Sequence, residues 1–157
     1  MKRVDVDAER VFMSDDYFRL LNFSETKFDL DLSLLEKNYI EIQANFHPDR
    51  FFSIQDKEAA VRHMAKVNEA YLVLKSPMKR AEYILKKDGI KISEADRGRI
   101  IAEVLDFEAD SSELSEEISA CVGGIESSFS GGDVYRAAVL TEKLKYLVKI
   151  RKSGGGV

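Results

Sequence analysis

A histidine, a proline, an aspartate and an arginine follow one another at residues 47–50. An imidazole close to a carboxylate is the pair that general acid–base catalysis uses, and histidine also binds metals. The chain has one other histidine, His63, and one cysteine, Cys121. A small hydrolase that uses His47 and Asp49 is therefore one hypothesis for the function.

The spacing of these residues does not support a metal or cofactor site. His47 and His63 are far apart in the sequence, and one distant cysteine completes no zinc signature. Cys121 falls on an apolar helical stripe, which favours a buried, inert thiol, and His63 is expected at the surface or at its boundary. The sequence also contains no glycine-rich phosphate loop and no G-x-S-x-G elbow. We therefore predict no catalytic residue, no metal and no cofactor.

The His-Pro-Asp segment interrupts two predicted helices. The first is capped by Asp31, and its apolar stripe consists of Leu35, Tyr39, Ile42 and Phe46. Pro48 cannot continue a helix and disfavours helical geometry at the residue before it, so His47 is expected to end this helix. The next helix is expected to start near Ser53, with Ala60, Met64, Val67, Tyr71 and Leu74 as its stripe.

The remaining segments also have the periodicity of helices. A first helix is expected to start at Ser14, and another runs from Ser76-Pro77 to about Lys87, with Gly89 as a left-handed stop. Three further helices follow at about residues 93–107, 114–129 and 133–152. No strand pattern is found, which predicts an all-α chain with a boundary near residues 88–94.

Composition and charge narrow the class of protein. The net charge of −4 argues against general nucleic-acid binding, and no apolar run approaches the roughly 20 residues that span a bilayer. The N-terminus has no apolar export segment, and one cysteine excludes an internal disulfide. We expect a protein of a reducing, cytoplasmic compartment. Its charge is uneven: residues 75–91 and 134–152 are basic, whereas 92–133 are strongly acidic.

The helices around the His-Pro-Asp segment resemble a known family, the J-domain co-chaperones. The stretch NYIEIQANFHPDRFF, residues 38–52, carries the hallmark of that family between two helices with matched stripes. The stretch VNEAYLVLKSPMKRAEYIL, residues 67–85, resembles the HscB sub-family, which is dedicated to iron–sulfur cluster assembly. A general DnaJ-type chaperone is disfavoured, because the chain has no glycine/phenylalanine-rich linker and no CxxCxGxG repeat.

The resemblance implies a fold and a function. Residues 1–90 would form a J-domain, residues 91–152 a small three-helix bundle, and residues 153–157 a flexible tail. The J-domain would dock on a 70-kDa heat-shock chaperone of the HscA or DnaK type and stimulate its ATP hydrolysis, so the chain itself would not be an enzyme. The implied chaperone-binding residues are His47, Pro48, Asp49, Arg50 and Lys37, with Asp49 presented to a basic site on the partner.

The resemblance also implies a client surface on the C-terminal half, for the iron–sulfur scaffold protein IscU. The matching residues are Ile101, Ala102, Leu105, Asp106 and Tyr146. Ala102 departs from the family, which often has a larger apolar residue there. For Ile101 and Leu105, ordinary core packing is an equally good interpretation.

A second departure concerns charge. The helix before the His-Pro-Asp segment is usually basic in this family, but here it has only Lys37 against three acidic residues, and Asn38 and Ala44 stand where arginine is common. We expect docking that is weaker and less dependent on salt, unless Arg50, Arg62 or Lys66 compensates. The alternative function is a degenerate J-like module that binds a partner without stimulating ATP hydrolysis.

Overall fold

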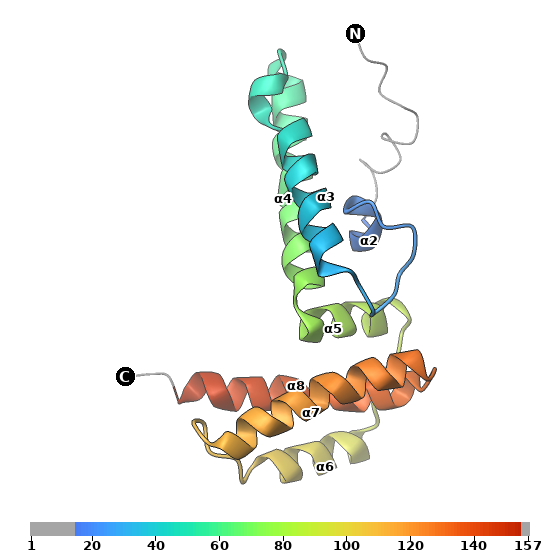
Figure 1. Cartoon of the computed structure of the whole chain (residues 1–157), viewed down its shortest axis with the longest axis vertical. Helices are drawn as coiled ribbons and strands as arrows, with labels where there is room; N and C mark the ends of the chain where they lie inside the picture. The colour runs from blue at the N-terminus through green and yellow to red at the C-terminus, as the bar shows by residue number, and fades with distance from the viewer. Residues whose placement is uncertain (1–14, 155–157) are drawn as a thin grey trace. The chain divides into compact units, whose positions relative to one another are not determined.

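The computed structural model describes residues 15–154, and these residues form seven α-helices and one short 3-10 helix without any strand (Figure 1). The elements are α2 (Tyr17–Leu20), α3 (Leu32–Asn45), η1 (Pro48–Arg50), α4 (Ile54–Lys75), α5 (Pro77–Lys87), α6 (Glu94–Val104), α7 (Ser112–Ser130) and α8 (Val134–Ser153). The predicted all-α fold class is confirmed.

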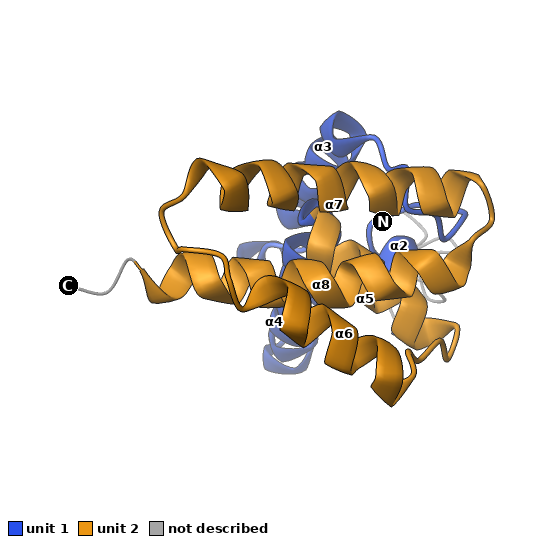
Figure 2. Ribbon diagram, turned by 90° about the horizontal axis from the view of Figure 1, so that it is seen from below, with its two compact units in different colours: residues 1–76 blue, residues 77–157 orange. Residues whose placement is uncertain are grey.

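The chain divides into two compact units, residues 1–76 and 77–157 (Figure 2). Pro77 is the first residue of α5, and α5 packs against α7 and α8 of the second unit. The predicted J-domain, residues 1–90, instead includes α5, which the packing places in the second unit. The predicted functional domains, residues 1–90 and 91–152, remain a prediction, because packing alone does not define which residues serve which partner.

The first unit is built on a hairpin of α3 and α4, which run side by side in opposite directions, and α2 packs against α4 (Figure 1). Asp31 caps α3 by accepting from the amides of Ser33 and Leu34, and Ser53 caps α4 by accepting from the amide of Asp56. Both caps are as predicted. The core of this unit contains buried apolar side chains, among them Phe18, Leu20, Leu21, Leu35, Ile42, Val67 and Leu74.

The start of the first described helix differs from the prediction. This helix, α2, begins at Tyr17, and the carboxylate of Asp16 accepts from the amides of Phe18 and Arg19 as its N-cap. The expected start at Ser14 is therefore wrong, although Ser14 itself lies outside the described residues. Asp16 displaces the predicted cap because aspartate is at least as good an N-cap as serine and stands directly before the helical turn.

Polar contacts lock the two helices of the hairpin in register. The rings of Tyr39 and Tyr71 stack with centroids 4.0 Å apart, and the Tyr39 hydroxyl donates to Asn68 Oδ1 over 2.8 Å. Gln43 Nε2 donates to the same hydroxyl. Because Tyr39 lies in α3 and its partners Tyr71 and Asn68 lie in α4, these contacts fix which residues face each other across the hairpin.

In the second unit, α8 contacts each of the other three helices, and α7 lies alongside it in the opposite direction (Figure 2). The largest fully buried side chains of this unit are Leu114, Cys121, Ile125, Leu144 and Leu147. Ser93 and Asp133 cap α6 and α8 as predicted. Gly89 has a φ of 69°, which confirms the predicted left-handed stop after α5.

The C-terminal end of α8 extends one residue into the predicted tail. The helix ends at Ser153 with Gly154 as its C-cap, and residues 155–157 lie outside the described part of the chain. Among residues 15–154, no helix is long and apolar enough to cross a bilayer.

Candidate functional site

The His-Pro-Asp segment forms a single 3-10 turn at the end of the α3–α4 hairpin. His47 has an extended backbone and is the N-cap of this turn: its Nδ1 accepts from the amide of Asp49 over 3.3 Å. Pro48 occupies the first position of the turn, where a missing amide hydrogen costs nothing. The Arg50 amide donates to the carbonyl of His47, which closes the turn.

This turn presents its carboxylate to solvent. The side chain of Asp49 is 90% exposed and that of His47 is 61% exposed. The Nδ1 atom of His47 also lies 3.5 Å from Asp49 Oδ2. By accepting from the amide, His47 holds the backbone of the turn, and the exposed carboxylate of Asp49 remains available to a partner.

The turn is anchored to α4 through an aromatic contact. Phe46, the C-cap of α3, packs against His63 with 4.5 Å between ring centroids. His63 is buried, so its predicted place at the surface or its boundary is wrong. Burial lowers the pKa of His63, and the positive charge of Lys66 lowers it further. A neutral imidazole therefore supports the residue that precedes the His-Pro-Asp turn.

The charge on α3 is as sparse as the sequence indicates. Lys37 is exposed and is the only basic residue of the helix, with exposed Glu36 beside it and Glu41 one turn later. Asn38 is buried and donates from Nδ2 to the carbonyl of Leu21 over 2.8 Å. The side chain of Asn38 therefore ties α3 to Leu21, the C-cap residue of α2.

The two basic residues of α4 that could compensate already have acidic partners. Lys66 Nζ lies 2.8 Å from Asp15 Oδ1, and this pairing lowers the pKa of Asp15 through a hydrogen bond first and through charge second. Arg62 lies 4.0 Å from Glu58, one turn earlier on the same helix. Arg50, directly after the turn, is exposed.

Four of the five predicted client residues lie at the C-terminal end of α6 or just after it, and all four are exposed. Ile101 and Leu105 have exposed fractions of 38% and 73%, while Ile100 and Val104 of the same helix are buried. The inner face of α6 therefore packs through Ile100 and Val104, and not through the predicted client residues. Core packing is excluded for Leu105 and disfavoured for Ile101. Ala102 and Asp106 are exposed on the same stretch of chain.

The fifth, Tyr146, lies on α8 and is partly buried. It lines a hollow of about 300 Å³ together with Met78 and Glu82 of α5 and with Lys149 and Lys152 of α8. None of the four predicted client residues near the end of α6 lines this hollow. The structure therefore groups those four residues in one stretch and places Tyr146 in a separate depression.

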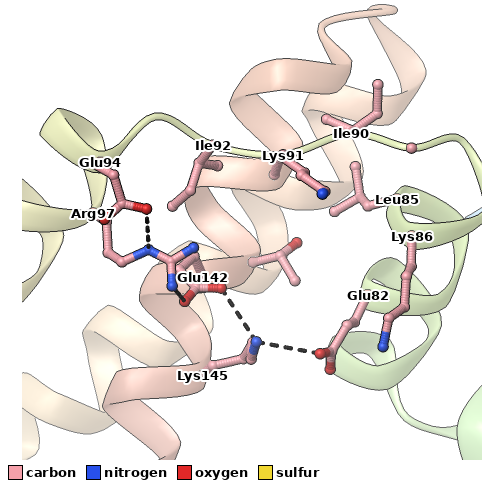
Figure 3. A pocket seen from close by; sticks show the side chains of 13 residues that line it. Glu82, Leu85, Lys86, Ile90, Lys91, Ile92, Glu94, Arg97, Glu142 and Lys145 are labelled. Atoms are coloured by element: carbon pink, nitrogen blue, oxygen red, sulfur yellow. Dashed lines mark hydrogen bonds and ion pairs between the residues drawn. The ribbon is translucent and has the colours of Figure 1, made fainter.

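Ion pairs hold α5, α6 and α8 together beside a second hollow of about 440 Å³ (Figure 3). Lys145 of α8 lies 3.2 Å from both Glu82 of α5 and Glu142 of α8. Burial disfavours the charged form of Lys145, but its hydrogen bonds with Glu142 and Glu82 outweigh this and raise its pKa. Arg97 of α6 bridges Glu94 and Glu142, each 3.9 Å away. This chain of charges fixes the start of α6 relative to α8.

A second ion-pair cluster ties the C-terminal end of α6 and the N-terminal third of α7 to α8. Lys143 Nζ lies 2.6 Å from Glu117 of α7 and 3.2 Å from Glu103 of α6. Burial opposes ionisation here too, yet the hydrogen bonds with the two carboxylates raise the pKa of Lys143. The acidic stretch 92–133 and the basic last helix, which the sequence shows as charge blocks, therefore meet within one unit.

The geometry does not support a hydrolytic or metal site. His47 and Asp49 project into solvent rather than into an enclosed site that could exclude water. His63 is buried against Phe46, and burial raises the pKa of the Cys121 thiol to about 11. Among the described residues, no three histidine, cysteine or acidic side chains are grouped so as to hold a metal.

The exposed turn, the locked hairpin and the small preceding helix define the class of protein. The family model of the DnaJ domain matches residues 16–83, which include α2, the hairpin and most of α5. Residues 16–83 thus match a J-domain, and its His-Pro-Asp turn is intact.

Comparisons that extend beyond the J-domain identify the family more closely. The chain is 29% identical to a co-chaperone protein HscB homolog of Shewanella woodyi, over 87% of this chain and 92% of that protein. It is 33% identical to the mouse iron–sulfur cluster co-chaperone protein HscB, over 87% of this chain but 66% of the mouse protein. The structure matches the chaperone HscB from Vibrio cholerae with a TM-score of 0.69, 27% identity, and coverage of 88% of this chain and 94% of that one. Human HscB matches with a TM-score of 0.70, 25% identity, and coverage of 88% and 79%. The chain belongs to the HscB-type J-domain co-chaperones.

Proposed function

We propose that this chain docks on the ATP-bound form of a specialised 70-kDa heat-shock chaperone and stimulates ATP hydrolysis by that partner. The observation that carries the proposal is the exposed carboxylate of Asp49 on a turn that His47 and Pro48 hold. A carboxylate presented in a fixed direction is suited to a charge-assisted pair with an arginine of the partner. Arg50 and Lys37 are the exposed cations that would add contacts around this pair.

We further propose that the C-terminal unit binds an IscU-type iron–sulfur scaffold and delivers it to the chaperone, in the bacterial cytoplasm. The exposed side chains Ile101 and Leu105, next to Ala102 and Asp106, support this part of the proposal. Exposed apolar side chains beside a carboxylate are suited to a partner surface that is itself apolar with a basic rim. Tyr146 is the remaining proposed contact.

Single-turnover ATP hydrolysis by the chaperone tests the first part, with the wild-type chain, with Asp49→Ala and without the chaperone. Stimulation that is lost in Asp49→Ala supports the proposal. If the wild type does not stimulate, the degenerate J-like module is the better account, and the single basic residue of α3 is the observation that favours it. Hydrolysis in the absence of chaperone would point to the hydrolase hypothesis.

Scaffold affinity of three variants tests the client surface. Leu105→Ala is expected to weaken binding about tenfold or more, since it removes the more exposed of the two large apolar side chains of the surface. Tyr146→Ala tests whether the separate depression also contacts the scaffold, and unchanged affinity would remove Tyr146 from the surface. The exposed Leu72 of α4, in the other unit, supplies the matched control Leu72→Ala, which should bind like the wild type.

A further inference from the structure

Phe52 is the most exposed large apolar residue that the structure describes. Its exposed fraction is 103%, so the ring has no protein neighbours that shield it from water. Ile54, two residues later at the start of α4, is also exposed. Single exposed apolar residues are ordinary, but a fully exposed phenylalanine next to a second apolar residue is typical of an interaction surface.

The fold does not require an aromatic side chain at this position. The backbone enters from Phe51, which is extended, after the Phe51 amide donates to the carbonyl of Pro48. It leaves through Ser53, whose hydroxyl accepts from the Asp56 amide and caps α4. The main chain and the Ser53 hydroxyl therefore make the contacts that hold this segment, and none of these contacts involves the side chain of Phe52. A smaller side chain at position 52 should leave the turn and the cap intact.

Phe52 lies within reach of any protein that binds Asp49. The two residues are three positions apart, and three residues span at most about 11 Å. Local hydrogen bonds fix both ends of this short segment, at His47 and at Ser53. A partner that pairs with the carboxylate of Asp49 is therefore close enough to contact the ring of Phe52 as well.

Because α3 carries little positive charge, an apolar contact would supply affinity that this helix does not supply through charge. Lys37 is the only cation on that helix, so α3 itself offers little positive charge to attract a partner. Aromatic side chains supply binding free energy without charge when they enter a pocket on the partner.

We propose that Phe52, together with Ile54, is an apolar anchor that enters a hydrophobic recess next to the site that receives Asp49 on the 70-kDa chaperone. The proposal rests on the proposed function and adds to it a chemical property of the partner surface. It assigns separate roles to two neighbouring residues: Asp49 triggers hydrolysis, and Phe52 contributes to affinity.

Titration of the ATP-bound chaperone with each variant separates these roles, with hydrolysis in single turnover and binding by biolayer interferometry as readouts. Phe52→Ala is expected to raise the half-stimulating concentration and the Kd about tenfold, while hydrolysis at saturation stays near the wild-type rate. Phe52→Leu should restore most of the affinity. Asp49→Ala should instead lose stimulation at every concentration.

The exposed Leu72 gives a matched control, because it lies about 27 Å along α4 from Ile54. Leu72→Ala is expected to match the wild type. An unchanged Kd and half-stimulating concentration in Phe52→Ala, or an equal loss in Leu72→Ala, would overturn the anchor while leaving the role of Asp49 intact. A wild-type chain that neither binds nor stimulates the chaperone would overturn both. Self-association in sedimentation that Phe52→Ala abolishes, with chaperone binding unchanged, would assign the ring to a second copy of the chain and also overturn the proposal.

Discussion

The ring of His63 lies 4.5 Å from that of Phe46, centroid to centroid, directly behind the residue that leads into the His-Pro-Asp turn. His63 is buried on α4 and Phe46 ends α3, so one contact joins the two helices of the hairpin at its functional end. The exposed turn is thus supported by a buried group that can take up a proton.

This contact predicts a pH dependence of stability. Burial holds the pKa of His63 below its usual 6.5, so the unfolded chain takes up the proton first as the pH falls. Stability from the neutral ring is present above the unfolded pKa, about 6.5, and is lost as the pH falls towards the folded pKa. Hydrogen exchange of the α4 amides at pH 7.5 and 5.5 measures this loss. His63→Gln should show a smaller loss than the wild type.

The exposed histidine is the control for this experiment. His47→Gln removes the only other histidine, whose side chain is largely in solvent, and should keep the wild-type pH dependence in α4. An equal loss in His63→Gln and wild type would show that other groups, such as carboxylates, cause the effect.

The hydroxyl of Tyr39 is expected to contribute to the stability of the hairpin. Tyr39→Phe keeps the stack on Tyr71 but removes the hydrogen bonds with Asn68 and Gln43. We expect a loss of about 0.5–1 kcal/mol in the free energy of unfolding, measured in urea. Tyr71→Phe also keeps the stack and should change stability by less than about 0.5 kcal/mol. Equal effects of the two substitutions would contradict the role of the hydroxyl.

Two adjacent glycines inside α7 should respond differently to alanine. A Cβ at Gly123 would meet open space, whereas a Cβ at Gly124 would lie 2.8 Å from Leu140 Cδ1. Gly123→Ala should raise the free energy of unfolding by about 0.5–1 kcal/mol through helix propensity. Gly124→Ala should gain less, because Leu140 must move. Urea unfolding checks both, and a larger gain in Gly124→Ala would contradict the packing described.

Docking on the chaperone should depend only weakly on salt. Lys37 stands alone on α3 and Lys66 is paired with Asp15, so few cations remain to steer the encounter. Stopped-flow association rates across a range of ionic strength measure this. Glu41→Lys adds an exposed cation to α3 and should raise both the rate and its salt dependence. A steep dependence in the wild type would show that other cations, such as Arg50, dominate.

The parts of the fold that depend on neighbouring residues in the sequence could be predicted, and the parts that depend on distant ones could not. The caps Asp31, Ser53, Ser93 and Asp133 were predictable because a cap bonds amides two or three residues away. The turn was also predictable, because Pro48 restricts only its own backbone and that of the residue before it. The burial of His63 was missed although its spacing from Ala60 and Val67 places it on the buried face of α4, because a polar residue beside an apolar stripe was taken for a surface residue. The ring of Phe46 that packs against it comes from the other helix.

The same difference applies to the candidate sites. The exposure of Leu105 could not be decided from its helix, because an amphipathic helix with two adjacent apolar faces does not reveal which face packs. Asn38 had no visible purpose in the sequence, since its bond to the carbonyl of Leu21 exists only when α2 and α3 are folded together. The exposed ring of Phe52 also became apparent only when the turn and the Ser53 cap were in place.

The most direct test of the central claim is single-turnover ATP hydrolysis by the partner chaperone with Asp49→Asn. Asparagine keeps the size of the side chain and leaves the amide that donates to His47 Nδ1, so the turn should keep its shape and only the charge is lost. The account predicts that stimulation disappears while the circular dichroism spectrum and the thermal unfolding match the wild type. Stimulation by Asp49→Asn at the wild-type level would contradict it.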